Sequence, residues 1–385
     1  MVAVKTLVSG AVLAGLAPSA FAATIIGWNT ANVAVAPTPA DYVTATSVVF
    51  DRDAGDPAAS PTGAIAFTPP EAASPGIKVV NGAFELGGPG PQPSIAGCIM
   101  ASSSATCDSP FQSGKRFKEI VTGKAPVDLV FDLGPDSPSF ENVGYEVYHR
   151  LVNDTGVALR GFTIELGFGV GSGFVASSAG DGLGFSTGFT AGPDDLNAFS
   201  QFPFGLFGDA DGNPNFTLDG FFAAERTGFD LLFSEDILSS QGFYGPYADL
   251  FGPWMTRDVV PDGAFWDFDS DPLTDDLLMA WQREDSVWEL RRDIVNGVAV
   301  SLAVAEEFAS LADVIARLGV QLGDGPIEDL ANLNATYAIA LADSFSGDDF
   351  TLRVTVAPVP LPGAAPLLIA ALAVFGLAAR RRAAA

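Results

Sequence analysis

Two acidic runs have the residue types and the spacing of calcium-binding loops. Alternating carboxylates in a tight loop can turn several oxygen atoms toward one hard cation. Neither run matches an EF-hand, because Gly212 comes too early in the first and Pro272 replaces the turn glycine in the second. Two interpretations stay open for both: a Ca²⁺ site or a solvated acidic turn. The oxygen-bearing positions are Asp209, Asp211 and Asn213 in the first run, and Asp267, Asp269 and Asp271 in the second.

Enzymatic chemistry has little support in the sequence. The only histidine, His149, lies in an alternating run beside Tyr148 and Arg150, where a histidine is more often structural than catalytic. Folding could bring any two of the 46 acidic residues to the separation that glycoside hydrolysis needs, but the sequence selects no pair. We therefore assign no catalytic residue and expect a protein that is not an enzyme.

The region 244–288 adds aromatic residues to the second acidic run. Tryptophan rings can stack on sugars, and they can equally fill a core. An alternative function therefore stays open, a secreted glycan-binding module or a glycan-active hydrolase that uses this region. Its aromatic residues include Tyr244, Tyr247, Trp254, Trp266, Trp281 and Trp288.

Two cysteines, Cys98 and Cys107, are the only ones in the chain. In an exported protein such a pair predicts a disulfide that closes a small surface loop. A ring of this size is expected to contribute about 2–3 kcal/mol to stability. The alternative is that the two thiolates bind a metal ion, but the chain has no further cysteines to complete such a site.

An N-terminal segment, residues 1–22, has the three parts of a signal peptide. Lys5 supplies the positive charge, an apolar core follows, and Ala20 and Ala22 form an A-x-A cleavage site. Export implies the translocon and signal peptidase as partners, and a mature chain that begins near Ala23.

The C-terminal segment 358–385 has the pattern of a second targeting signal, after the signal peptide. A proline motif at 359–363 precedes an uncharged apolar stretch at 364–379. At about 1.5 Å per residue this stretch spans roughly 24 Å as a helix, less than the ~30 Å hydrocarbon core. The three residues after it are Arg380, Arg381 and Arg382.

This pattern predicts a short transmembrane helix with its arginines in the cytoplasm and the β-rich cargo, residues 23–357, outside. A plain membrane anchor is the alternative. The marginal length and the prolines Pro360 and Pro362, which keep the linker extended and accessible, favour a segment that is cut off after export.

The tail resembles the PEP-CTERM sorting signal recognised by exosortases, in its Val-Pro-Leu-Pro variant. It departs from the Pro-Glu-Pro form at Leu361, and it has Gly363 where the variant usually has alanine. Those departures leave the particular sorting enzyme open. The resemblance implies an exosortase-type sorting protease as a partner, and attachment to the membrane only before processing.

The central block is similar to the choice-of-anchor F family. The similarity rests on the cysteine-containing run 96–118, on Tyr-Glu-Val-Tyr-His-Arg-Leu-Val-Asn at 145–153, and on Gly-Phe-Thr-Ile-Glu-Leu-Gly-Phe-Gly at 161–169. That family comprises bacterial exported proteins that join one cargo domain to varied C-terminal anchors. It implies surface presentation and no known activity.

Charge narrows the choice of partners. The chain has 19 basic and 46 acidic residues. Without Lys5 and the three tail arginines, 15 basic residues remain, which gives a net charge near −31. This charge argues against nucleic acid and anionic lipid surfaces as partners, because both need a cationic surface on the protein. We expect an exported cell-surface or extracellular-matrix protein, with exopolysaccharide as a candidate partner.

The cargo sequence predicts mostly β-strands, in a β-sandwich or jelly-roll-like domain with long Gly-rich loops. Alternating apolar residues mark strands at 127–133, 145–153, 162–168 and 351–356, and shorter ones at 47–50, 64–67 and 77–80. The turn at 153–156 predicts that the second and third of these strands form a hairpin. Apolar residues at helical spacing predict one packed amphipathic helix at 306–318, which Gly319 would end.

Overall fold

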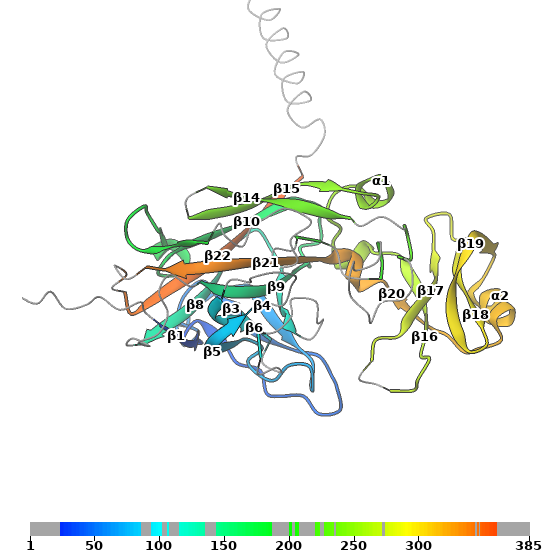
Figure 1. The fold of residues 1–385 in the computed structure, drawn as a ribbon, viewed down its shortest axis with the longest axis horizontal. Helices are drawn as coiled ribbons and strands as arrows, with labels where there is room; N and C mark the ends of the chain where they lie inside the picture. The colour runs from blue at the N-terminus through cyan, green and yellow to red at the C-terminus, as the bar shows by residue number, and fades with distance from the viewer. Residues whose placement is uncertain are drawn as a thin grey trace, which may run out of the picture.

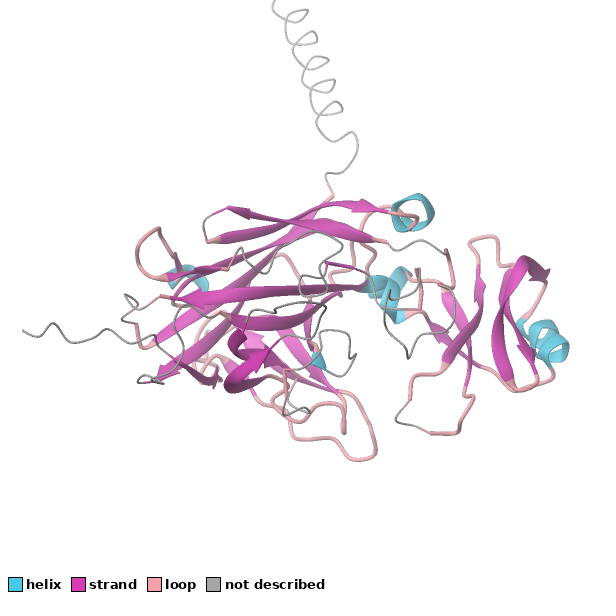
Figure 2. Cartoon of the chain, viewed as in Figure 1, coloured by secondary structure: helices cyan, strands magenta, loops and turns pink. Residues whose placement is uncertain are grey.

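The structure is a computed structural model in which β-strands predominate and the helices are few and short (Figures 1 and 2). The expected mainly β class is confirmed. The residues described are 24–85, 94–101, 106–107, 115–134, 144–186, 200–201, 205–207, 220–223, 227–234, 236–271, 274–342, 345 and 347–359.

One large sheet contains 17 strands. They are β1 (Thr24–Asn29), β2 (Val33–Ala34), β3 (Ala45–Phe50), β4 (Pro61–Phe67), β5 (Lys78–Glu85), β6 (Ser94–Met100), β7 (Phe117–Val121), β8 (Val127–Gly134), β9 (Tyr145–Asn153), β10 (Leu159–Phe168), β11 (Val175–Ala176), β12 (Leu183–Phe185), β13 (Ser200–Gln201), β14 (Gly228–Ser234), β15 (Ile237–Tyr244), β21 (Asn332–Leu341) and β22 (Asp349–Pro358).

The pairing order of this sheet departs from the order of the chain. One arm runs β1–β8–β22–β10–β15–β14. Through β13 it joins a second arm, β21–β9–β7–β4–β3–β2. Strand β6 also pairs with β9, and β5 pairs with β6. Strand β9 is therefore bonded along both edges, to β21 on one and to β6 and β7 on the other.

The two arms share one apolar core. Leu129 of β8, Ile164 of β10 and Leu352 of β22 contribute from the first arm, and Val147 of β9 and Tyr337 of β21 contribute from the second. All five are fully buried. Figure 1 shows the corresponding layers, with β10, β14 and β15 on one side and β4, β6 and β9 on the other. Strand alternation, which places every second side chain on one face, lets both arms line this core.

A second, five-stranded sheet lies at one end of the molecule (Figure 1). Its small core includes Met279, Leu290 and Val314. Trp281 packs edge-to-face on Phe222 at 5.2 Å and so links this sheet to the main core. The sequence did not predict this separate sheet. In spatial order its strands are β19 (Val298–Phe308), β18 (Trp288–Val295), β17 (Leu277–Gln282), β16 (Asp262–Trp266) and β20 (Gly323–Pro326).

The predicted helix begins later than expected. Helix α2 is Leu311–Leu318, whereas Glu306 and Phe308 belong to β19 and pair with Leu290 and Trp288 of β18. The Ser310 side chain accepts a hydrogen bond from the Asp313 amide at 3.2 Å and fixes the start. Gly319 ends the helix at φ 71°, as predicted. The other helical segments are α1 (Tyr247–Phe251), η2 (Gly171–Gly173), η4 (Arg257–Val259) and η5 (Glu328–Ala331).

The predicted strands are confirmed as β3, β4, β5, β8, β9, β10 and β22, but the predicted hairpin is wrong. Strands β9 and β10 follow each other in the chain and do not pair. Strand β9 pairs with β6, β7 and β21, whereas β10 pairs with β11, β15 and β22. The reason is burial, because all nine residues of β9 are buried and the strand occupies an inner position in the second arm.

Gly97 offers a test of the close packing around β9. A Cβ added there would lie 2.1 Å from the Val80 carbonyl oxygen and 2.9 Å from the Tyr145 ring. Overpacking of this kind costs about 1–3 kcal/mol. We therefore expect Gly97→Ala to lower the free energy of unfolding by that amount in urea denaturation. Gly123→Ala is the matched control, since a Cβ there meets nothing within 4 Å. Equal stability of the two variants would contradict the packing described here.

Candidate functional site

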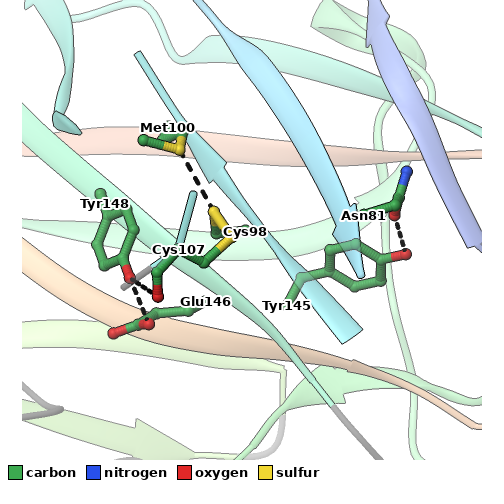
Figure 3. Close-up of a disulfide and its surroundings, with 7 residues drawn as sticks. All are labelled: Asn81, Cys98, Met100, Cys107, Tyr145, Glu146 and Tyr148. Atoms are coloured by element: carbon green, nitrogen blue, oxygen red, sulfur yellow. Dashed lines mark hydrogen bonds between the residues drawn. A yellow bond between two sulfur atoms is a disulfide. The ribbon is translucent and has the colours of Figure 1, made fainter. Parts of the chain in front are cut away.

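The predicted disulfide is present. The Cys98 and Cys107 sulfur atoms are 2.08 Å apart, and the two Cα atoms are 5.9 Å apart. Both cysteines are fully buried, so the prediction of a surface position is wrong. The bridge packs inside an apolar cluster with Met100, Tyr148 and other residues, because strand β6 lies beside β9 and not at an open edge (Figure 3).

Several predicted site residues lie outside the described residues. These residues are the signal cleavage site Ala20 and Ala22, the first acidic run Asp209, Asp211 and Asn213, and the sorting motif with its basic stop, Pro360, Leu361, Pro362, Arg380, Arg381 and Arg382.

No helix in the described part of the chain is long and apolar enough to cross a membrane.

The second acidic run forms an exposed loop after β16. The Asp267 carboxylate accepts a hydrogen bond from the Ser270 amide at 2.6 Å, and Asp269 accepts from the Thr274 hydroxyl at 2.9 Å and from the Asp271 amide at 3.0 Å. These bonds hold the turn itself. Among the described residues no group of three or more His, Cys, Asp or Glu is arranged to hold a metal ion. Calcium binding stays a prediction.

The aromatic residues of region 244–288 do not form one surface. Trp254 and Tyr247 are fully buried in the main core, and Trp288 is buried in the core of the second sheet. They cannot stack on an external sugar. Trp281 and Trp266 are partly buried against the two cores, and the Tyr244 side chain lies outside the described residues. The Trp266 ring lies 6.2 Å from the ring of Phe268, a side chain that is 52% exposed.

His149 lies fully buried on β9 and has a structural role there. Its Nε2 lies 3.0 Å from Glu119 Oε2 and its Nδ1 lies 3.2 Å from Tyr337 Oη. The Phe117 ring stacks on the imidazole at 4.3 Å. Burial raises the pKa of Glu119, and the hydrogen bond from His149 opposes that rise. With both ring nitrogens engaged inside the core, His149 has no access to a substrate.

The opposite face of β9 carries a buried polar cluster, which we call the polar face and which the sequence pattern did not predict. In the sheet register Arg150 lies between Lys118 of β7 and Asn334 of β21, and Tyr148 lies beside Thr336 of β21. Alternation puts these side chains on the face opposite to Phe117 and His149. The members of the polar face are Arg116, Lys118, Glu146, Tyr148, Arg150, Asn334 and Thr336.

Most of the polar face is shielded from water. Arg116 is 2% exposed, and Glu146, Tyr148 and Thr336 are fully buried. Lys118 is partly exposed and reaches Glu71 at 3.4 Å. The polar face therefore becomes more open toward Lys118. Alternating polar residues in β9 were visible in the sequence, but they ordinarily indicate a solvent face, and only the tertiary packing shows that they are buried.

Burial controls the titration of this face. It raises the pKa of the Glu146 carboxyl to about 8, although Tyr148 Oη donates to Glu146 Oε2 at 2.7 Å (Figure 3). It also lowers the pKa of the Arg116 guanidinium to about 9, and the positive charge of Arg150 acts in the same direction. At neutral pH Glu146 is therefore largely protonated while Arg116 remains charged.

No family model matches the chain, and the comparisons with curated proteins and with solved structures found no match.

The raised pKa of Glu146 predicts a pH-dependent stability. The folded chain keeps this proton up to about pH 8, whereas the unfolded chain loses it near the ordinary pKa of 4.5. Between these values the unfolded state binds fewer protons, so stability falls as the pH rises. Glu146→Gln keeps an acceptor for Tyr148 and cannot ionise. In urea unfolding, we expect its stability relative to the wild type to increase steadily from about pH 5 to about pH 8.

The control is Glu284→Gln, because Glu284 is exposed. Its difference from the wild type should stay flat over the same range. A flat difference for Glu146→Gln as well would show that this carboxyl ionises normally.

Proposed function

We propose that this chain is an exported bacterial cell-surface or extracellular-matrix protein. In this proposal its body is a β-sandwich-type cargo domain, and an exosortase-type sorting protease cuts within the tail 358–385, near Pro362, after export. The signal peptide 1–22 and the tripartite tail are the sequence basis of the proposal.

The Cys98–Cys107 disulfide is the observation that carries it. Disulfides form and persist in oxidising compartments and are rare in the cytosol. Both cysteines of the chain are used in this one bridge. Because the bridge is buried against β9, it belongs to the folded core of the cargo. A chain that completes its core with a disulfide is suited to folding outside the cytoplasm.

The position of the last strand also supports the proposal. Strand β22 ends at Pro358, and the Val359 amide donates a hydrogen bond to the Ala158 carbonyl at 3.4 Å. The expected boundary between cargo and tail therefore coincides with the end of the sheet.

Processing predicts a defined product. We expect intact-mass and C-terminal peptide analysis of the protein from its native host to give a chain that begins near Ala23 and ends near Pro362. Added mass at the new C-terminus would indicate transfer to another molecule. A product that retains Arg380–Arg382 would instead mean a plain membrane anchor, and the sorting proposal would be wrong.

Glycan binding is a second candidate function, and the pair of partly buried Trp266 and exposed Phe268 favours it. The pair flanks Asp267, and Asp269 follows directly, so an aromatic surface lies beside carboxylates. Aromatic rings can stack on a sugar, and carboxylates can accept bonds from its hydroxyl groups. Exopolysaccharide would be the partner.

This candidate predicts that binding on a broad glycan array depends on both rings. We expect Trp266→Ala and Phe268→Ala each to reduce the signal at least about tenfold, equivalent to about 1.4 kcal/mol. Tyr42→Ala is the control, because Tyr42 is an aromatic residue that is 44% exposed away from this loop. An array without signal for the wild type would remove the candidate.

A further inference from the structure

Arg116 is a buried cation without hydrogen-bond partners for two of its nitrogen atoms. Arg116 is the residue directly before β7, and it is 2% exposed. Neither its Nε nor its Nη2 has a hydrogen-bond partner. Buried charges are ordinarily paired, because leaving one unpaired costs several kcal/mol. The packing that surrounds Arg116 therefore leaves two strong donors without an acceptor.

The neighbouring carboxyl does not take up these donors. Glu146 lies close enough to interact electrostatically with Arg116, yet its Oε2 is engaged by Tyr148 and its Oε1 has no hydrogen-bond partner. Since Glu146 is largely protonated at neutral pH, it leaves the charge of Arg116 mostly uncompensated. Arg150 adds a second guanidinium, whose Nε is held by Asn334 Oδ1 at 3.0 Å and whose Nη1 lies 3.8 Å from Asp329 Oδ1.

The free donors of Arg116 are arranged for an oxyanion. Nε–H and Nη2–H lie on one edge of the planar guanidinium, and this edge can donate two parallel hydrogen bonds to two oxygens of one acceptor. Thr336 Oγ1 is also buried without a partner, but it lies on β21, with Tyr148 of β9 between it and the β7 side.

We propose that the polar face binds a small oxyanion, held by the Nε–Nη2 edge of Arg116 and stabilised by the charge of Arg150. The chemistry is that of a carboxylate, sulfate or phosphate group, because only an acceptor with negative charge satisfies both donors and the excess positive charge. Its source is either a free inorganic anion or the carboxylate of an acidic sugar. The site does not depend on export or on cleavage of the tail.

Anion titrations of the purified full chain, with its disulfide intact, test the proposal. The probes are sodium sulfate, sodium phosphate and sodium glucuronate, each at ionic strength held constant with sodium chloride. Bound anion must raise the melting temperature, since a ligand that binds only the folded state stabilises it. We expect saturable stabilisation and a matching heat of binding by calorimetry. Response to sulfate or phosphate identifies an inorganic anion, and response to glucuronate alone identifies an acidic sugar.

Substitutions at the proposed site should abolish the anion response, whereas a substitution of an arginine elsewhere should leave it unchanged. Arg116→Met removes the donors, so the anion response should disappear or require about tenfold more anion. Arg116→Lys keeps the charge but loses the two-donor edge of the guanidinium, so it should weaken binding severalfold and provides a second test if the first variant fails to fold. Arg257→Met is the control, because Arg257 lies on η4 and pairs with Glu328 at the surface.

The proposal is overturned if wild-type protein shows no saturable response to any of the three anions. It is also overturned if Arg116→Met retains the wild-type response, or if Arg257→Met loses the response as completely as Arg116→Met does.

Discussion

The two-sided pairing of β9 is the constraint on which the structure depends. The strand is bonded to β21 along one edge and to β6 and β7 along the other, and it is buried over its full length. The side chains on both of its faces are therefore shielded from water, and the polar ones need hydrogen-bond partners inside the protein. One face joins the main apolar core through Val147 and Leu151, and the other carries Glu146, Tyr148 and Arg150.

Two polar groups on opposite faces of this strand show how the chain meets that demand. On the core face, His149 is engaged at both ring nitrogens by Glu119 and Tyr337. On the polar face, the Tyr148 hydroxyl is bonded to Glu146, and Arg116 keeps two unpaired donors. In the first arrangement both imidazole nitrogens have partners, and Glu119 Oε1 is the one carboxylate oxygen left without one. In the second, two donors of a buried cation lack partners, and such donors are where a ligand has most to contribute.

The sequence predicted the strands better than their partners. Alternation located β8, β9 and β22, because each presents apolar residues to the shared core at every second position. It misplaced the helix start, since Glu306 and Phe308 also suit the last residues of β19. It suggested a β9–β10 hairpin, because a turn signal cannot tell a hairpin from a crossing between arms. The polar face was not predictable, as its burial depends on strands distant in sequence. The cysteines were paired correctly and placed at the wrong depth.

The last strand has a mechanical consequence. Strand β22 lies between β8 and β10 and is antiparallel to both. It pairs with β8 over Asp349–Val354 and with β10 over Thr351–Pro358, so two edges are bonded in its middle and one edge at its C-terminal end. A tether that pulls along this strand would load both rows of hydrogen bonds in shear, because these bonds lie across the strand. Many bonds would then share the force together, whereas an edge strand pulled sideways would open one bond at a time. If the proposed surface attachment holds the chain at this end, the pairing of β22 with β8 and β10 resists unfolding from it.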